Sequence, residues 1–417
     1  MNLTVSQRYL VITTIFTLSA SLIWGVNVLF LLHYGLDIFQ VFVLNAAFSI
    51  ASAFCEVPTG VLADTRGRKF SLAIGALVLA ASTVGYVIAG RTAHPYFWFI
   101  VMSAALGLGF SFMSGSLEAW LVDALQFNGQ GGDVDRVMAR GVMANNVAML
   151  VGSVGGGVLG DIDLSIPYVV RVALLLILFA FVVKLVVEYG FTPQTVTWRE
   201  LPAAMRHTAV DGFQFGWRHR SIKQMMMVNF LQGGFMFWGF YAWQPHLLRL
   251  WGENSVWLSG LIAALNALAG FFGAALVGQL ATRMRRRSSA LMIGLLLQVV
   301  CAVVLGVMDS FWFASAALIL MMAAAGFMMP MRQAYLNSLI PSNKRATVLS
   351  FDSLVNNAGA SAGSPALGWV DKSLGTQYGY LIGSALLALG IPMMMRLRGY
   401  GDKEDFLQTF VETNRSS

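Results

Sequence analysis

Charged side chains are scarce in this chain. Asp, Glu, Lys and Arg together make up 11% of its 417 residues, whereas ordinary soluble domains carry about 25%. Hydrophobic residues make up 57% of the chain, and a soluble protein of this length could not bury that much apolar surface. The chain is therefore expected to lie largely within a lipid bilayer.

Other absences exclude whole classes of chemistry. Only two cysteines are present, Cys55 and Cys301, each inside an apolar run, which excludes a disulfide framework. No Gly-x4-Gly-Lys-Ser/Thr phosphate loop occurs, so ATP hydrolysis by this chain is not expected. No His-Glu-x-x-His sequence and no cysteine pair at metal-binding spacing occurs either. We therefore expect no enzyme activity, no cofactor and no metal site.

The net charge of +7 does not indicate a nucleic-acid partner, because the basic residues lie in short links between apolar runs. Apolar windows of about 20 residues, the length that crosses a bilayer as a helix, recur twelve times. They lie at residues 10–34, 38–62, 70–90, 96–123, 138–160, 166–189, 223–246, 257–281, 289–308, 311–336, 347–370 and 378–396. The sequence thus predicts an all-α membrane protein with twelve transmembrane helices.

The spans form two sets of six. An N-terminal six-helix bundle is predicted at 1–190, a cytoplasmic linker at 191–222, a C-terminal six-helix bundle at 223–398 and a cytoplasmic tail at 399–417. If the N-terminus is inside, the inner links and tails hold 22 of the 27 Lys and Arg residues, and the outer links hold three. The positive-inside rule therefore predicts that both termini are cytoplasmic. The expected location is the inner (plasma) membrane.

The two halves repeat each other. The stretch 60–64 (Gly-Val-Leu-Ala-Asp) recurs as 278–282 (Gly-Gln-Leu-Ala-Thr), and basic residues follow both copies. Asn145-Asn146 recurs as Asn356-Asn357. Duplicated six-helix halves of equal orientation are pseudo-symmetric, and such an arrangement places a binding site at their interface near the bilayer midplane.

Glycines predict close packing in the fifth span. Gly152, Gly156 and Gly160 recur every four residues, so they lie on one face of a helix. Small residues at this spacing allow two membrane helices to approach closely.

The most informative motif is the stretch 60–69, Gly-Val-Leu-Ala-Asp-Thr-Arg-Gly-Arg-Lys, directly after the second span. With the two six-helix halves and the basic linker, this motif resembles the major facilitator superfamily over about residues 8–398. The stretch 56–60, Glu-Val-Pro-Thr-Gly, resembles the drug-efflux-like, proton-antiporter branches. The resemblance implies alternating-access transport of a small-molecule substrate, coupled to protons, by a monomer in a lipid bilayer.

The same resemblance implies a conformational latch. In that fold the carboxylate of Asp64 lies near the start of span 11, and Arg68 pairs with an acid at the inner end of span 4, for which Asp123 is the candidate. The predicted latch comprises Gly60, Asp64, Gly67, Arg68 and Asp123. The second copy has Thr282 in place of the acid and Arg285 in place of the glycine, so only the first copy can form the full latch.

Glu118 is the first candidate for proton coupling. Ionisable side chains inside a bilayer are costly and usually mark a pathway. Glu118 lies five residues before Asp123, which places the two acids about 140° apart around an α-helix, so they are expected to have different roles. The alternative is a structural carboxylate paired with Arg140.

Glu56 is the second candidate for proton coupling. It lies two residues before Pro58, where a proline can bend the helix, as a moving element would require. The alternative is a structural carboxylate that bonds between spans 2 and 11, near Asp352.

Polar and aromatic residues inside several spans are candidates for a substrate cavity: Trp24, Asn27, Asn229, Gln232, Trp238, Tyr241, Arg332 and Gln333. Asn229, Gln232, Met236 and Phe240 keep helical spacing, so one face of the seventh span runs from polar to apolar. The 22 Met and 29 Phe residues favour a deformable apolar cavity. A sugar would need a denser lining of amides and carboxylates. For Arg332 the alternative is an anchor at the inner membrane surface.

These expectations lead to one preferred function and three alternatives. The preferred function is proton-coupled efflux of hydrophobic or amphipathic small molecules. The alternatives are a proton symporter for a metabolite, a facilitator for one, and a non-transporting membrane sensor or lipid-handling protein. The complete motif at 60–69 argues against the last, because a static protein would not need a latch.

Overall fold

The computed structural model describes residues 3–189, 210, 214, 216–252, 255–281, 284–341 and 344–407. Within these ranges the regular structure is helical, apart from one isolated bridge between Arg286 and Phe406. Internal contacts divide the chain into a first unit, residues 1–203 with 254–264, and a second unit, residues 204–253 with 265–417. Most of the predicted linker and much of the predicted tail lie outside the described residues, so the predicted domain boundaries stay a prediction.

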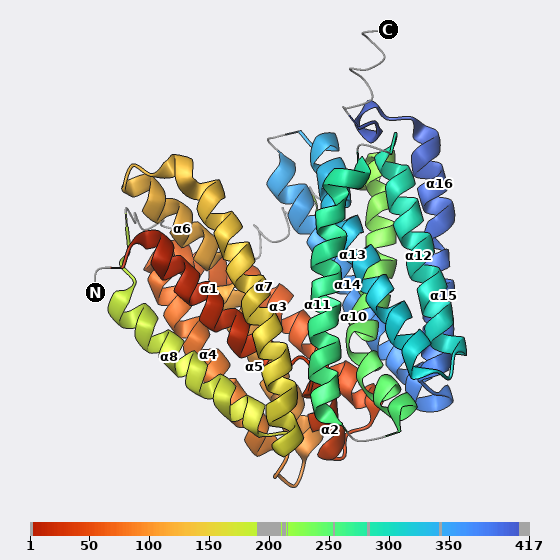
Figure 1. Cartoon of the computed structure of the whole chain (residues 1–417). Coiled ribbons are helices and arrows are strands. Elements are labelled where there is room, and N and C mark those ends of the chain that lie inside the picture. Colours follow the sequence, from red (N-terminus) through yellow and green to blue (C-terminus); the bar gives the residue numbers. More distant parts are fainter. Residues whose placement is uncertain are drawn as a thin grey trace. The chain divides into compact units, whose positions relative to one another are not determined.

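The first set of helices follows the first six predicted spans (Figure 1). It comprises α1 (Val5–Ser21), α2 (Asn27–His33), α3 (Ile38–Arg66), α4 (Arg68–Ala89), α5 (Pro95–Met113), α6 (Ser116–Phe127), α7 (Val134–Ile162) and α8 (Ile166–Leu185). The second set comprises α10 (Arg220–Trp251), α11 (Val256–Ala281), α12 (Arg287–Val307), α13 (Phe311–Leu339), α14 (Arg345–Leu374), α15 (Thr376–Ala388) and α16 (Gly390–Tyr400). Short 3-10 helices occur at Gly131–Asp133 and Lys403–Asp405.

The twelve predicted spans are confirmed, although three of them are broken. The first predicted span is divided into α1 and α2 by a turn, and the last is divided into α15 and α16 at Leu389. The fourth is divided into α5 and α6 at Gly115, whose φ of +72° belongs to a region that glycine enters most easily. Hydropathy alone misses such breaks because the apolar run continues through them.

Nine spans of the described chain, including the divided α5–α6 and α15–α16 pairs, are long and apolar enough to cross a membrane. The remaining three spans are the divided α1–α2 pair and the helices α10 and α14. The last two carry polar residues such as Asn229 and Asp352 in their interior. Their polarity is explained by the cavity that they line, described below.

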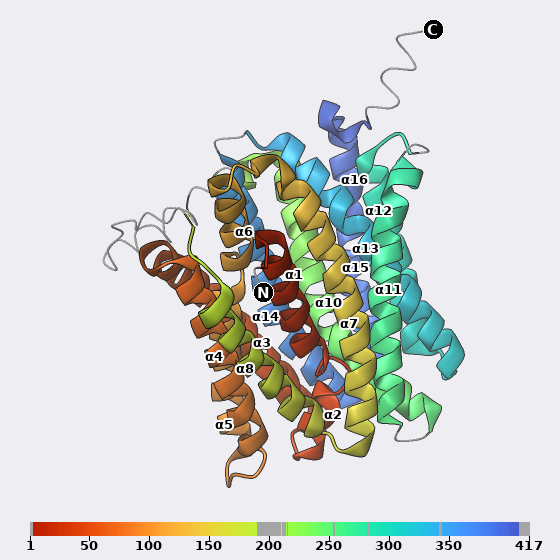
Figure 2. The same cartoon turned by 60° about the vertical axis from the view of Figure 1, so that its left-hand side comes forward.

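Corresponding helices pack alike in the two units. In the first unit α4 packs against α5 and α8, and α1 packs against α7 and α8 (Figure 2). In the second unit α12 packs against α13 and α15, and α10 packs against α14 and α16. The duplication read from the sequence is therefore a duplication of packing as well.

The predicted glycine packing in the fifth span is confirmed within the first unit. A Cβ at Gly152 would lie 2.0 Å from Ser21 Oγ, and one at Gly156 would lie 1.9 Å from the carbonyl oxygen of Leu22. In the second unit a Cβ at Gly359 on α14 would lie 2.1 Å from the carbonyl oxygen of Phe230 on α10. Both helix pairs therefore meet backbone to backbone, as small residues permit.

Each unit buries its own core, and large apolar side chains also cover the outside. Ile12, Leu72 and Leu175 are fully buried in the first unit. In contrast, Ile162 is 74% exposed and Trp312 is 72% exposed. Large apolar side chains scattered over long helices are favourable where the surrounding solvent is lipid.

Candidate functional site

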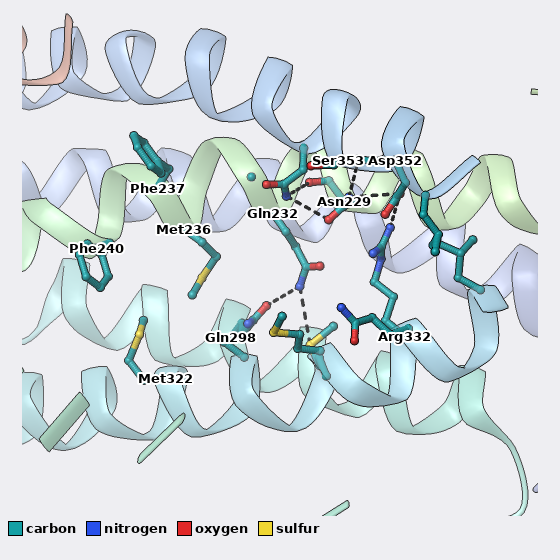
Figure 3. A pocket seen from close by; sticks show the side chains of 18 of the residues that line it. Asn229, Gln232, Met236, Phe237, Phe240, Gln298, Met322, Arg332, Asp352 and Ser353 are labelled. Carbon is teal, nitrogen blue, oxygen red and sulfur yellow. Dashed lines mark hydrogen bonds and ion pairs between the residues drawn. The ribbon is translucent and has the colours of Figure 1, made fainter. Parts of the chain in front are cut away.

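A cavity of about 830 Å³ lies within the second unit, between α10, α12, α13 and α14 (Figure 3). Small-molecule sites typically measure about 300–1,000 Å³, so the volume suits a small organic ligand. The lining residues named below come from all four helices. The cavity is thus built by side chains that are far apart in the sequence.

The lining changes from polar to apolar along the cavity. Arg332 and Asp352 lie near one end, and Phe240 and Met322 lie toward the other (Figure 3). The predicted face of α10 contributes to both ends, because Asn229, Gln232, Met236 and Phe240 all line the cavity. An amphipathic lining of this kind suits a ligand with one polar and one apolar end.

An ion pair occupies the polar end. Arg332 Nη2 lies 2.5 Å from Asp352 Oδ1, and the two side chains are 15% and 9% exposed. Asn229 Nδ2 also donates to Asp352 Oδ1, at 3.2 Å, and Asn356 Nδ2 donates to Asn229 Oδ1 at 3.0 Å. Arg332 is therefore held inside the cavity by an ordered network.

Several polar atoms beside the cavity have no hydrogen-bond partner in the described part of the chain. Gln232 Nε2 donates to Gln298 Oε1 at 2.9 Å, but Gln298 Nε2 makes no hydrogen bond although the residue is fully buried. Arg332 Nε and Asn337 Oδ1 are also buried without a partner. Unmade hydrogen bonds are costly in a buried site, so the polar end of the cavity is not fully satisfied in this conformation.

Four of the predicted cavity residues line this cavity: Asn229, Gln232, Arg332 and Gln333. Trp238 does not, because it is fully buried with its ring centroid 4.9 Å from that of Tyr380. Tyr241 is not among the lining residues either. Successive residues of an α-helix are rotated by about 100°. Trp238, two residues after Met236, therefore points to nearly the opposite side of α10.

The two predicted cavity residues of the first unit lie elsewhere. Trp24 lies in the turn between α1 and α2. Asn27 is buried and accepts a hydrogen bond from the Tyr168 hydroxyl at 2.8 Å. Asn27 therefore connects α2 to α8 in this structure, and neither residue lines the cavities described in this section.

A second cavity, of about 340 Å³, lies within the first unit between α1, α5, α6 and α7. Glu118 lines it together with Tyr9 and Thr13. Within the described chain Glu118 has no ion-pair partner, so the alternative pairing with Arg140 is not formed. Among the described residues, Glu118 is thus the one acid that lines this cavity.

The repeated asparagines have corresponding roles in the two units. In the first unit the Thr17 hydroxyl donates to Asn145 Oδ1, between α1 and α7. In the second unit Asn356 donates to Asn229, between α14 and α10. Both bonds join the first and fifth spans of a unit beside its cavity. The sequence repeat therefore marks a repeated helix–helix contact.

Glu56 lies exposed on α3, which continues through Pro58 to Arg66. No ion pair of Glu56 occurs within the described ranges. Those ranges also contain no group of three or more His, Cys, Asp or Glu residues that could hold a metal ion.

Two charged residues of the motif at 60–69 come together with an acid on α6 in the first unit. Arg68 Nη1 lies 3.0 Å from Asp64 Oδ1, and Arg68 Nε lies 3.5 Å from Asp123 Oδ2 on α6. Gly67, with a φ of +99°, separates α3 from α4. Gly60 is exposed on α3, with open space where a Cβ would lie. The arginine therefore bridges both acids, which lie on different helices.

Glu188 is part of this network and was not among the predicted residues. Its carboxylate accepts hydrogen bonds from the backbone N–H groups of Arg68, at 3.0 Å, and Lys69, at 2.8 Å. It therefore caps the N-terminus of α4, where unpaired N–H groups and the helix dipole favour an anion. The only sequence signal is an acid at the very end of the sixth predicted span.

The second unit has an equivalent cap. Asp405 Oδ1 accepts from the Ser288 backbone N–H, and Oδ2 accepts from the Ser288 hydroxyl, both at 2.7 Å. Ser288 lies in the first turn of α12, which corresponds to α4. An acid after the last helix of each unit thus caps the third span of that unit.

Twelve spans in two duplicated sets, three of the spans broken, with an internal cavity in each set, define a multi-pass membrane transporter. The chain belongs to the Major Facilitator Superfamily, which it matches over residues 9–289 and 254–412.

Solved structures share this fold. The nucleoside transporter NupG (D323A mutant) aligns with a TM-score of 0.79 at 14% identity, over 94% of this chain and 100% of that chain. A bacterial homologue of the human lysosomal transporter Spinster, in an inward-facing and occupied conformation, gives 0.75 at 12% identity, over 97% of both chains. The inward-open xylose transporter XylE from E. coli gives 0.70 at 13% identity, over 98% of both chains. At such identities the likeness shows the fold alone.

A sequence relative is also found in Bacillus subtilis (strain 168). It is an uncharacterized MFS-type transporter, YxaM, which is 26% identical over 160 residues. The match spans 36% of this chain and 36% of that protein's length. It supports the family and leaves the substrate open.

Proposed function

We propose that this chain is a proton-coupled secondary transporter that exports hydrophobic or amphipathic small molecules by alternating access. The observation that carries the proposal is the amphipathic cavity of the second unit, with Arg332 and Asp352 near one end and Phe240 and Met322 toward the other. Its volume of about 830 Å³ is that of a small-molecule site. The resemblance of residues 56–69 to drug-efflux-like transporters supports the outward direction.

Glu118 is the proposed proton-coupling residue, with Glu56 as the competing candidate. Glu118 lines a cavity between four helices and lacks an ion-pair partner in the described chain. A carboxylate in such a place can alternate between a proton and other partners as its access changes. Asp64, Arg68 and Asp123 are proposed to govern the conformational change without contacting the substrate.

The proposed setting is the inner membrane, with both termini cytoplasmic and the protein acting as a monomer. The excess of Lys and Arg in the predicted inner links supports this orientation. The bundles at 1–190 and 223–398 are proposed to be the two moving bodies. Reporter fusions at each terminus would check the orientation.

A second candidate is proton symport or facilitated transport of a polar metabolite. The observation that favours it is the density of amides in the larger cavity, which include Asn229, Gln232 and Gln298. A hydroxyl-rich molecule needs such a lining. Among the similar structures are a nucleoside transporter and a D-xylose–proton symporter.

Transport by inverted membrane vesicles under an imposed pH gradient tests the proposal. A panel of lipophilic compounds and a panel of nucleosides and sugars would be offered to the same vesicles. Gradient-dependent uptake of the lipophilic compounds, which corresponds to export from cells, is the expected result. Uptake that survives collapse of the gradient would refute proton coupling.

Two matched variants locate the coupling residue. Glu118→Gln keeps the shape and removes the titratable group, and it is expected to abolish gradient-driven transport. Glu56→Gln makes the same chemical change on α3 and is expected to retain gradient-driven transport. The opposite pattern would assign coupling to Glu56, and full activity of both variants would exclude both acids.

A further inference from the structure

The larger cavity is electrically neutral although it contains two charges. Among the described residues that line it, Arg332 and Asp352 are the only ionisable side chains, and they pair at 2.5 Å. At 15% and 9% exposure, they are little screened by water, so each charge depends on the other. Interactions of this kind are strong in a medium of low dielectric constant.

A charged ligand would disturb this balance. An anionic group that approaches Arg332 also approaches Asp352, and one negative charge remains uncompensated. A cationic group that approaches Asp352 also approaches Arg332, and one positive charge then remains uncompensated. Uncompensated charge is costly in a buried site and within a bilayer. An uncharged ligand causes neither problem.

The amide side chains of the lining specify what the polar end of the ligand should present. Gln232, Gln333 and Asn337 line the cavity and are not fully buried. Each amide group offers both an N–H donor and a carbonyl acceptor. A ligand that pairs with them needs a carbonyl-type acceptor and a nearby N–H donor, which a carboxamide or a lactam provides.

The rest of the cavity specifies the body of the ligand. Met236, Phe240 and Met322 lie away from the ion pair (Figure 3). Methionine side chains are flexible and adapt to varied apolar shapes. The apolar portion is therefore loosely specified, whereas the polar end is specified by charge and by hydrogen-bonding pattern.

We propose that this cavity selects uncharged amphipathic molecules with an apolar body and a carboxamide-type polar end, and that the Arg332–Asp352 pair excludes ions of either sign. The inference rests on the proposed function, because it names the substrate class of that transporter. The pair discriminates by charge, and Gln333 and Asn337 bind the polar end.

Binding of three matched compounds to the purified full-length protein tests this selection. Phenylbutyramide, phenylbutyrate and phenylbutylamine share an apolar body and end in a carboxamide, a carboxylate and an ammonium group. Dissociation constants come from the rise in melting temperature over a concentration series. The carboxamide is expected to bind at least about tenfold more tightly than either ion, since each ion leaves a buried charge unpaired.

Variants of the Arg332–Asp352 pair are expected to change the order in which the three compounds bind, from tightest to weakest. Asp352→Asn leaves Arg332 unpaired, so the carboxylate becomes the tightest ligand. Arg332→Gln leaves Asp352 unpaired, so the ammonium compound becomes the tightest. The double variant R332Q/D352N has no charge in the cavity and is expected to restore the preference for the carboxamide. A single variant that fails to fold leaves the wild-type series and the double variant as tests.

Three results would overturn the inference. They are equal or tighter binding of an ion to the wild type, an unchanged order in the folded single variants, and no binding of any of the three compounds. The measurement uses no proton gradient, so its failure is distinguishable from failure of proton-coupled export in vesicles.

Discussion

The carboxylate of Glu188 lies directly over Gly67. A Cβ at Gly67 would lie 2.7 Å from Glu188 Oε2, while the same carboxylate accepts hydrogen bonds from the backbone N–H groups of Arg68 and Lys69. The glycine of the motif is therefore required twice, for its φ of +99° and for the space that the carboxylate occupies. This relationship explains why a glycine separates α3 from α4.

Gly67→Ala is predicted to destabilise the protein. The backbone conformation at this position is strained for any residue with a Cβ, at a cost of about 1–3 kcal/mol, and the new methyl group also displaces Glu188. The melting temperature of the purified protein should fall. Gly60→Ala is the matched control, because a Cβ there meets nothing within 4 Å. Equal melting temperatures for the two variants would contradict the argument.

Glu188→Ala is predicted to weaken the start of α4. Two backbone N–H groups lose their acceptor, and loss of a helix cap typically costs about 0.5–2 kcal/mol. Glu188→Gln keeps one side-chain oxygen, so its melting temperature should fall between those of the wild type and the alanine variant. Asp405→Ala makes the equivalent change at α12. If Glu188→Ala melts like the wild type, the cap contributes nothing to stability.

Much of the fold could be predicted from the sequence because its signals are local. Apolar length predicted the twelve spans, and the glycines of span 5 predicted a close approach to a neighbouring helix. The structure identifies that neighbour as α1 and Leu22 at its C-terminal end. Helical spacing placed Asn229, Gln232, Met236 and Phe240 on one lining face. Each of these features follows from the residue pattern of a single helix, or from the small residues that a close contact between two helices requires.

The rest depends on contacts between helices, which a single sequence does not encode in a readable form. The pairing of Arg332 with Asp352 requires the relative depth of α13 and α14, and the cap by Glu188 requires the path of the chain after α8. Trp238 was expected in the cavity because it is polar and aromatic, but it is buried against Tyr380. Its residue type could not distinguish the cavity face from the core face.

Gly156→Ala is predicted to disrupt the packing of α7 on α1. The added Cβ would lie 1.9 Å from the carbonyl oxygen of Leu22, so the two backbones must separate. Overpacking of this kind typically costs about 1–3 kcal/mol. Gly155→Ala is the control on the neighbouring residue, since its Cβ would meet only Leu22 Cδ2 at 4.0 Å. Thermal melting of both variants in detergent compares them, and a larger loss for Gly155→Ala would refute the packing.

Asp123→Asn is predicted to alter the transport rate while leaving stability nearly unchanged. Asp123 is 48% exposed and lies 3.5 Å from Arg68, and a half-exposed ion pair contributes at most about 1 kcal/mol to stability. If the pair stabilises one of two conformations, as the proposed latch requires, its loss shifts their equilibrium about fivefold. Initial rates in inverted vesicles and melting curves of the purified protein measure the two effects separately.

Asp135→Asn is the control, because Asp135 is an exposed acid at the start of α7 without an ion pair in the described chain. A rate like that of the wild type would argue against a latch at Asp123, and a large loss of stability would show that the pair is structural.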